Sequence, residues 1–268
     1  MTRMDQVTAS NPDAAAFAAD GAIVLRGAFA EWVEPLRAGI EKLMADPGPY
    51  ERSYTPKDGS ARFFQDLCNW QRIPEFRAFV EQGPGAAIAR RLMGSTGVRF
   101  FHDHVLVKEP GTSLVTPWHQ DAPYYCVDAE QSVSFWIPLD PVARDVTLEC
   151  VAGSHLWTKA LKPKRFDGTD LYDGDEREDM PDIDAERDRH RILGWEMEPG
   201  DAVAFHYRTM HGAPANTSPQ RRRRVFSARW VGDDAVFRDR GGRGSPPLRH
   251  LTLADGAPLE GAEFPRFT

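Results

Sequence analysis

The chain has 268 residues, of which 41% are apolar and 27% are charged, so it can form one large domain or two small ones with a substantial hydrophobic core. Its net charge of −7 argues against nucleic acid as the main partner, because a phosphate-binding surface needs a net basic covering. No run approaches the roughly 18 apolar residues of a membrane span, and the three scattered cysteines disfavour a disulfide framework, so we expect a soluble cytoplasmic protein.

The first hundred residues are predicted to be mainly helical. In the stretch from residue 31 to 44, Val33, Leu36, Ile40 and Leu43 recur near helical spacing, which is typical of an amphipathic helix. Glycine and proline separate the other segments and favour turns. We expect helices over residues 12–20, 31–44, 74–82 and 84–94, a buried strand over 21–27 and a loop over 46–64.

Beyond residue 97 the pattern changes to short apolar or alternating runs bounded by Gly, Pro and Asp, which predict strands. These runs cover residues 98–111, 131–140, 146–155, 200–207 and 223–232. Helices followed by a strand-rich body indicate an α+β fold around a sandwich or jelly roll. No segment resembles a linker, so we expect a single domain over residues 1–268.

Residues 166–190, "FDGTDLYDGDEREDMPDIDAERDRH", are strongly acidic and poor in large apolar side chains. Such a segment cannot pack a core of its own, so it is predicted to be a long surface loop or a mobile lid. A solvated insertion without a role in substrate binding explains the composition equally well.

The stretch "TPWHQDAPYYC" contains His119 and Asp121, which share one face if this part of the chain is extended. One imidazole and one carboxylate suit a divalent first-row metal. A second histidine would complete the two-histidine, one-carboxylate triad that is typical of non-haem Fe(II) oxygenases. By itself the motif is weak, because a chain with many aspartates contains such a pair by chance.

Two other arrangements of histidines could serve a metal. His102 and His104 share a strand face, as in some cupin sites, but no carboxylate lies two residues away on that face. Residues 200–224 contain His206 and His211, either of which could be the distal ligand, and Gly212 would let the backbone approach a ligand closely.

Arg222 follows His211 by 11 residues, and the next strand could bring its guanidinium back beside the metal. A planar guanidinium grips a carboxylate through two parallel hydrogen bonds, which suits a dicarboxylate cosubstrate. The basic run Arg221–Arg224 could instead belong to a solvated edge strand, where charge discourages aggregation.

Four motifs, "WHQD" (118–121), "VAGSH" (151–155), "GDAVAFH" (200–206) and "HGAPANTSPQRR" (211–222), together resemble the phytanoyl-CoA dioxygenase family of Fe(II)- and 2-oxoglutarate-dependent oxygenases. The resemblance extends from about residue 14 to about residue 232. It implies a double-stranded β-helix (jelly-roll, cupin-like) core with flanking N-terminal helices. It also implies that His119, Asp121 and His211 bind the iron, which leaves His206 as a non-ligand.

The resemblance further implies that Arg222 binds the distal carboxylate of 2-oxoglutarate, that Trp136 lies near this cosubstrate, and that His104 lies on the same side. The serine that often follows the distal histidine and glycine in the family is Ala213 here. Related halogenating enzymes replace the carboxylate ligand by a small residue, so the presence of Asp121 favours hydroxylation. The implied reaction uses Fe(II), 2-oxoglutarate and O2, hydroxylates a small-molecule or acyl substrate, and releases succinate and CO2.

Two alternatives remain open from the residues. A cupin-like isomerase or hydrolase that uses zinc or manganese would need the metal ligands but not Arg222. A binding module that has kept the fold and lost the chemistry would need neither. The sequence indicates neither the substrate, including whether it is a CoA ester, nor the oligomeric state.

Overall fold

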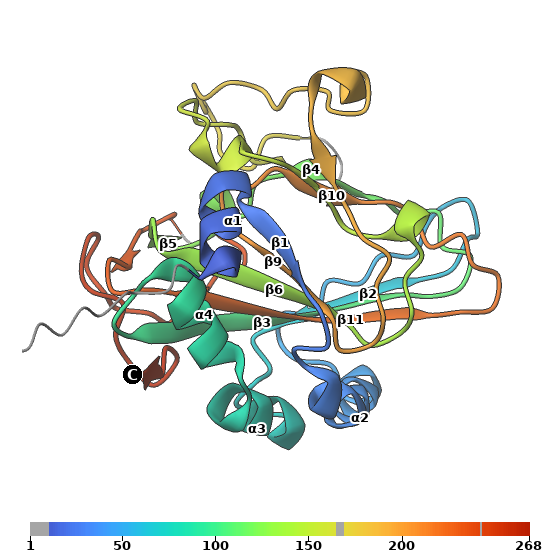
Figure 1. Cartoon of the computed structure of the whole chain (residues 1–268), viewed down its shortest axis with the longest axis horizontal. Helices are drawn as coiled ribbons and strands as arrows, with labels where there is room; N and C mark the ends of the chain where they lie inside the picture. Colours follow the sequence, from blue (N-terminus) through green and yellow to red (C-terminus); the bar gives the residue numbers. More distant parts are fainter. Residues whose placement is uncertain (1–10, 165–168, 242) are drawn as a thin grey trace, which may run out of the picture.

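The computed structural model describes residues 11–164, 169–241 and 243–268, and its strands form two main antiparallel sheets (Figure 1). The strands of the larger sheet are β1 (Ala22–Leu25), β2 (Phe63–Leu67), β3 (Val98–Lys108), β6 (Ser132–Pro138), β9 (Ala202–Phe205), β11 (Arg223–Val231) and β13 (Arg266–Phe267). Those of the smaller sheet are β4 (Thr116–His119), β7 (Glu149–Val151), β8 (Ile192–Leu193) and β10 (His211–Ala213). A separate ribbon pairs β5 (Val127–Asp128) with β12 (Val236–Phe237).

The order of strands in the larger sheet is β1-β9-β6-β11-β3-β13, with β2 also paired to β3, and that in the smaller sheet is β4-β10-β7-β8. Strands distant in the chain therefore lie side by side, as the two sheets of a jelly roll require. The predicted α+β class with a jelly-roll core and N-terminal helices is confirmed.

The predicted helices are also confirmed: α1 (Pro12–Asp20), α2 (Val33–Ala45), α3 (Pro74–Gln82) and α4 (Gly85–Met93). Local signals explain the bounds of α1. The side chain of Asn11 accepts a hydrogen bond from the backbone N–H of Asp13, and Gly21 ends the helix at a φ of 72°. None of the helices in the described ranges combines the length and the apolar character needed to cross a membrane.

The main core lies between the helices and the larger sheet. Phe76 and Phe79 of α3 contact Phe226 of β11, with ring centroids 4.7 and 5.2 Å apart. Alternate residues of a strand point to opposite faces. On β11 the set Phe226, Ala228 and Trp230 packs into this core, whereas the set Arg223, Val225, Ser227 and Arg229 lines a pocket on the other face. One strand thus determines both the core and one wall of the pocket.

Two segments differ from the expectation. Residues 46–64 were expected to be a loop, but Phe63 and Phe64 begin β2, which is buried because it pairs with β3. The acidic segment 166–190 does contribute to a core, because Ile183 is fully buried beside Leu161 and Met210. Residues 165–168, where this segment begins, lie outside the described ranges.

Gly200 is expected to be the glycine at which an alanine substitution destabilises the fold most clearly. Its φ is +87°, and a Cβ atom there would lie 2.5 Å from the Cα atom of Ala30. The substitution therefore combines left-handed strain with a clash against backbone, and we expect Gly200→Ala to cost on the order of 3 kcal/mol.

The matched control is Gly111→Ala, because Gly111 has a φ of +73° but nothing within 4 Å of the added Cβ atom. This variant should lose stability only through backbone strain, by about 1–2 kcal/mol. Urea unfolding of both variants measures the difference. Equal losses would show that the contact between Gly200 and Ala30 is not tight.

Candidate metal centre and its pocket

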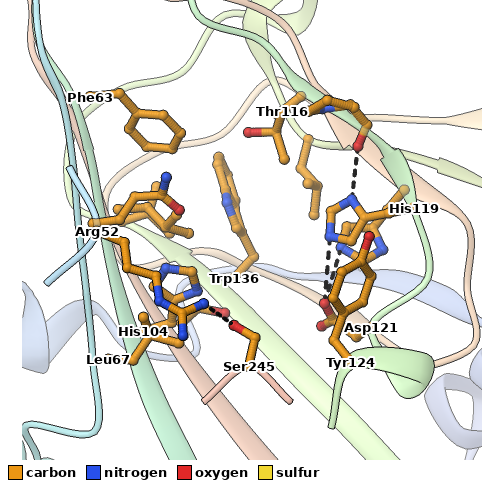
Figure 2. Close-up of a pocket in the computed structure, with 18 of the residues that line it drawn as sticks. Arg52, Phe63, Leu67, His104, Thr116, His119, Asp121, Tyr124, Trp136 and Ser245 are labelled. Carbon is orange, nitrogen blue, oxygen red and sulfur yellow. Dashed lines mark hydrogen bonds and ion pairs between the residues drawn. The ribbon is translucent and has the colours of Figure 1, made fainter. Parts of the chain in front are cut away.

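Three predicted ligands come together at one end of the smaller sheet. Figure 2 shows two of them, His119 and Asp121, next to each other. His119 is the last residue of β4 and His211 is the first of β10, and the pairing of these strands places the two opposite each other. The Nε2 atoms of His119 and His211 lie 3.5 and 3.8 Å from Oδ1 of Asp121. All three ligand atoms are within 4.8 Å of one another. Two imidazoles and one carboxylate at this spacing fit a divalent first-row metal.

Asp121 reaches this point by a different route from the one expected. It does not lie on a strand with His119, because β4 ends at His119 and Asp121 has helical backbone angles before the 3-10 turn Ala122–Tyr124. The backbone N–H of Asp121 donates to the carbonyl oxygen of Tyr207 at 2.8 Å. The turn is therefore fixed against the segment that follows β9, and it directs the carboxylate back toward the histidines.

The orientation of both histidine rings suits a metal. Nδ1–H of His119 donates to the carbonyl oxygen of Pro117 at 2.8 Å, and Nδ1–H of His211 donates to that of Thr209 at 2.9 Å. A carbonyl oxygen can only accept, so each proton resides on Nδ1 and each Nε2 keeps its lone pair toward Asp121.

Charge at the centre also favours metal binding. Burial alone would raise the pKa of Asp121, but the guanidinium of Arg229 at 3.6 Å, together with the two histidines, lowers this pKa well below its ordinary value. Burial and the neighbouring His119 lower the pKa of His211 to about 3. At neutral pH the site therefore offers an ionised carboxylate and a neutral imidazole, the protonation states that ligation needs.

The triad faces a pocket of about 620 Å³ between the two sheets. Trp136 of β6 and His104 of β3 line it; that they lie near the cosubstrate stays a prediction. Three more aromatic residues, Trp118, Tyr124 and Tyr125, also line the pocket, whereas Phe135 packs into the helix-side core. Leu171 and Met180 of the acidic segment contribute to the pocket wall; that this segment moves as a lid stays a prediction.

The other candidate histidines do not form a metal site within the described ranges. His102 and His104 both line the pocket, but no carboxylate joins them there at ligand distance. His206 has a structural environment. Its Nε2–H donates to the carbonyl oxygen of Glu130 at 2.8 Å, and its Nδ1 accepts from the backbone N–H of Arg208.

The expectation for Arg222 needs correction, because this residue does not line the pocket. Its guanidinium forms ion pairs with Glu41 at 3.0 Å and with Glu109 at 2.9 Å, on the side of the sheet away from the triad. Arg222 precedes β11, and the residue that follows it, Arg223, is the one that points into the pocket.

Arg223 and Lys108 form a buried basic pair on neighbouring strands. They are direct partners in the register of β11 and β3, with 6% and 2% of their surfaces exposed. Backbone carbonyls are their partners: Arg223 donates to Val146 and Pro214, and Lys108 donates to Pro214 at 2.9 Å. In the part of the chain that the structure describes, neither has a carboxylate within ion-pair distance.

The charge of this basic pair would suit an anion. Burial, and secondarily the charge of Arg223, lower the pKa of Lys108 to about 6. The fall in this pKa reflects the cost of a buried positive charge without a counter-ion, and a bound carboxylate would favour the protonated form of Lys108.

Sequence reasoning missed Arg223, Lys108 and Arg229. For the two arginines a signal was present. In a strand over this stretch, every second residue shares a face, so Arg223 and Arg229 lie on the same face as Ser227 and opposite the apolar Phe226. No local signal in the sequence marks Lys108, because its burial depends on the pairing of β3 with β11.

Comparisons with known proteins agree with this geometry. A sequence model described as phytanoyl-CoA dioxygenase matches residues 17–225. The non-haem alpha-ketoglutarate-dependent carbocyclase SnoK from nogalamycin biosynthesis is 25% identical with a TM-score of 0.76, over 97% of each chain. The epimerase SnoN, solved with Fe3+, alpha-ketoglutarate and nogalamycin RO, is 24% identical with a TM-score of 0.74, over 95% of this chain and 97% of that one.

EctD from S. alaskensis, solved with 2-oxoglutarate and 5-hydroxyectoine, is more distant in sequence. It is 20% identical with a TM-score of 0.68, over 96% of this chain and 88% of that one. At these identities SnoN and EctD show a shared fold.

Proposed function

The chain belongs to the phytanoyl-CoA dioxygenase family, and on that premise we propose that it is an Fe(II)- and 2-oxoglutarate-dependent oxygenase that hydroxylates a small-molecule or acyl substrate, with release of succinate and CO2. The observation that supports this most strongly is the shared pocket. The two-histidine, one-carboxylate set lines this pocket, and so does the buried basic pair Arg223 and Lys108, which has no carboxylate partner in the described ranges.

In this proposal His119, Asp121 and His211 hold the iron through Nε2, Oδ1 and Nε2. When bound, the iron together with 2-oxoglutarate and O2 supplies an oxidant able to act on a C–H bond. The protein keeps both imidazoles oriented through the carbonyls of Pro117 and Thr209. Ser134 and Arg229 lie beside the second carboxylate oxygen of Asp121, at 3.3 and 3.6 Å, and so leave Oδ1 for the metal.

Arg223 is the residue that we propose for the distal carboxylate of 2-oxoglutarate, in place of Arg222. Lys108 supports it and takes over the role of the family serine that is absent at Ala213. Its Nζ atom lies 3.4 Å from the carbonyl oxygen of Ala213, so it reaches the position beside that residue. Trp136 lines the same pocket as the basic pair and the triad.

Hydroxylation is favoured over halogenation because Asp121 is present to occupy a coordination position. Ring closure is a second candidate, since the carbocyclase SnoK is similar over 97% of both chains. The two outcomes differ in the product: hydroxylation adds one oxygen atom from O2, whereas ring closure removes two hydrogen atoms. Mass spectrometry after a reaction under 18O2 would distinguish them.

Anaerobic titration tests the proposal without knowledge of the substrate. Addition of Fe(II) and then 2-oxoglutarate to the purified chain should produce the weak visible charge-transfer band of a bidentate iron complex. Zinc in place of iron should give no band, which is the control. A folded chain that binds 2-oxoglutarate no better with iron than without it would contradict the proposed function and favour another metal chemistry in the same jelly roll.

A further inference from the structure

Arg52 is a cation of the pocket that the proposed function does not use. It lies between α2 and β2, and its backbone N–H donates to the carbonyl oxygen of Gln65 at 2.8 Å, which anchors the segment to the sheet. Its Nη1 atom donates to Oγ of Ser245 at 2.9 Å. Figure 2 shows Arg52, His104 and Ser245 gathered on the side of the pocket opposite His119 and Asp121.

The charges that line the pocket leave Arg52 without an ionic partner. Asp121 is the acidic side chain of the lining, and five are basic: Arg52, Lys108, Lys164, Arg223 and Arg229. Arg229 lies 3.6 Å from Asp121, and Lys164 forms an ion pair with Asp179 at 3.1 Å. Arg223 and Lys108 form the pair proposed for the cosubstrate. Within the described ranges Arg52 has no carboxylate within 4 Å, only the neutral hydroxyl of Ser245.

Apolar side chains form part of the pocket wall: Phe63 and Leu67 of β2, Leu106 of β3 and Trp136 of β6. In the view of Figure 2, Trp136 lies between Arg52 and His119. A volume of about 620 Å³ is within the usual range for a site that encloses a small organic molecule, and it leaves room beyond a bound dicarboxylate. Apolar side chains near a cation that has no carboxylate partner are complementary to an apolar molecule with an acid group.

Resting on the proposed function, we propose that the primary substrate is an apolar acid whose anionic oxygen group binds Arg52, so that its apolar body extends along Trp136 toward the metal ligands. The guanidinium can present two N–H groups to a carboxylate and keep its bond to Ser245. His104 lies beside this position, and burial, assisted by Arg229, lowers its pKa well below the ordinary value. As a neutral ring it adds polarity there without a competing charge.

The test compares an apolar acid with its neutral amide. The protein is loaded anaerobically with Fe(II) and saturating 2-oxoglutarate, so that the Arg223 end is filled, and is then titrated calorimetrically with 2-naphthoate or with 2-naphthamide. We expect the wild type to bind 2-naphthoate about tenfold more tightly than 2-naphthamide, because only the acid forms a charge-assisted pair. Arg52→Gln should lose this preference and leave the affinity for 2-naphthamide unchanged.

Arg62→Gln is the matched control, because Arg62 pairs with Glu51 near the same segment but does not line the pocket. It should behave as the wild type, and thermal unfolding should show that both variants are folded. Equal binding of acid and amide by the wild type would overturn the proposal. So would an unchanged preference in Arg52→Gln, or no binding of 2-naphthoate at millimolar concentration.

Failure of this inference is distinguishable from failure of the proposed function. The binding of 2-oxoglutarate is measured first, and Arg52→Gln should bind it as the wild type does. If the wild type does not bind 2-oxoglutarate with iron, the proposed function fails, and the titration of the metal-free chain still compares Arg52→Gln with Arg62→Gln.

Discussion

His211→Ala is expected to lose Fe(II) binding and, with it, succinate formation. His211 is 4% exposed, and its Nε2 atom lies 3.8 Å from Oδ1 of Asp121, so alanine at this position removes one of the three proposed ligands. Loss of groups that merely orient a ligand already weakens metal binding about 10- to 100-fold, so loss of the ligand should weaken it by more than about 100-fold. Equilibrium dialysis of iron under anaerobic conditions measures this directly.

His206→Ala serves as the matched control for His211→Ala. His206 is also buried, at 5% exposure, and lies five positions earlier, but it bonds to backbone and not to the triad. It should keep iron affinity within a few-fold of the wild type, even if the protein becomes less stable. Iron binding that survives in His211→Ala and disappears in His206→Ala would assign the distal ligand to His206.

Arg223→Ala is expected to weaken binding of 2-oxoglutarate by on the order of 100-fold, because removal of one partner from a buried charge pair costs several kcal/mol. The rate at saturating cosubstrate should change much less, since the distal carboxylate does not react. Titration of the charge-transfer band and the dependence of succinate formation on 2-oxoglutarate concentration give the two quantities.

Arg222→Ala is the decisive comparison, because it removes the same side chain one position away. Arg222 pairs with Glu41 and Glu109, about a third of its side chain is exposed, and it does not line the pocket, so its loss should change cosubstrate affinity less than about threefold. A larger effect at Arg222 than at Arg223 would restore the assignment that the resemblance implied and would contradict the geometry of β11.

The sequence determined those features that depend on near neighbours in the chain. Helix α2 follows from the spacing of Val33, Leu36, Ile40 and Leu43, all of which are buried. Membership of the family follows from motifs within four short windows. The convergence of His119, Asp121 and His211 is shown by the structure, whereas their role as iron ligands stays a proposal.

The tertiary structure alone decided which residues of these windows face the pocket. Arg222 and Arg223 are adjacent and identical, and only the pairing of β11 with β3 and β6 determines which one points inward. Because successive side chains of a strand alternate, an error of one residue moves a guanidinium from the cavity to the outer surface.

The same long-range contacts explain what local patterns could not indicate. Strand β2 was not predicted because the stretch before Phe63 is rich in turn residues. The strand forms because it pairs with β3. Arg52 and Ser245 are 193 positions apart, and Lys108 and Arg223 come from separate strands, yet each pair meets in one pocket. Charges and clefts of this kind arise from packing between distant segments, so the chain order contains no nearby signal for them.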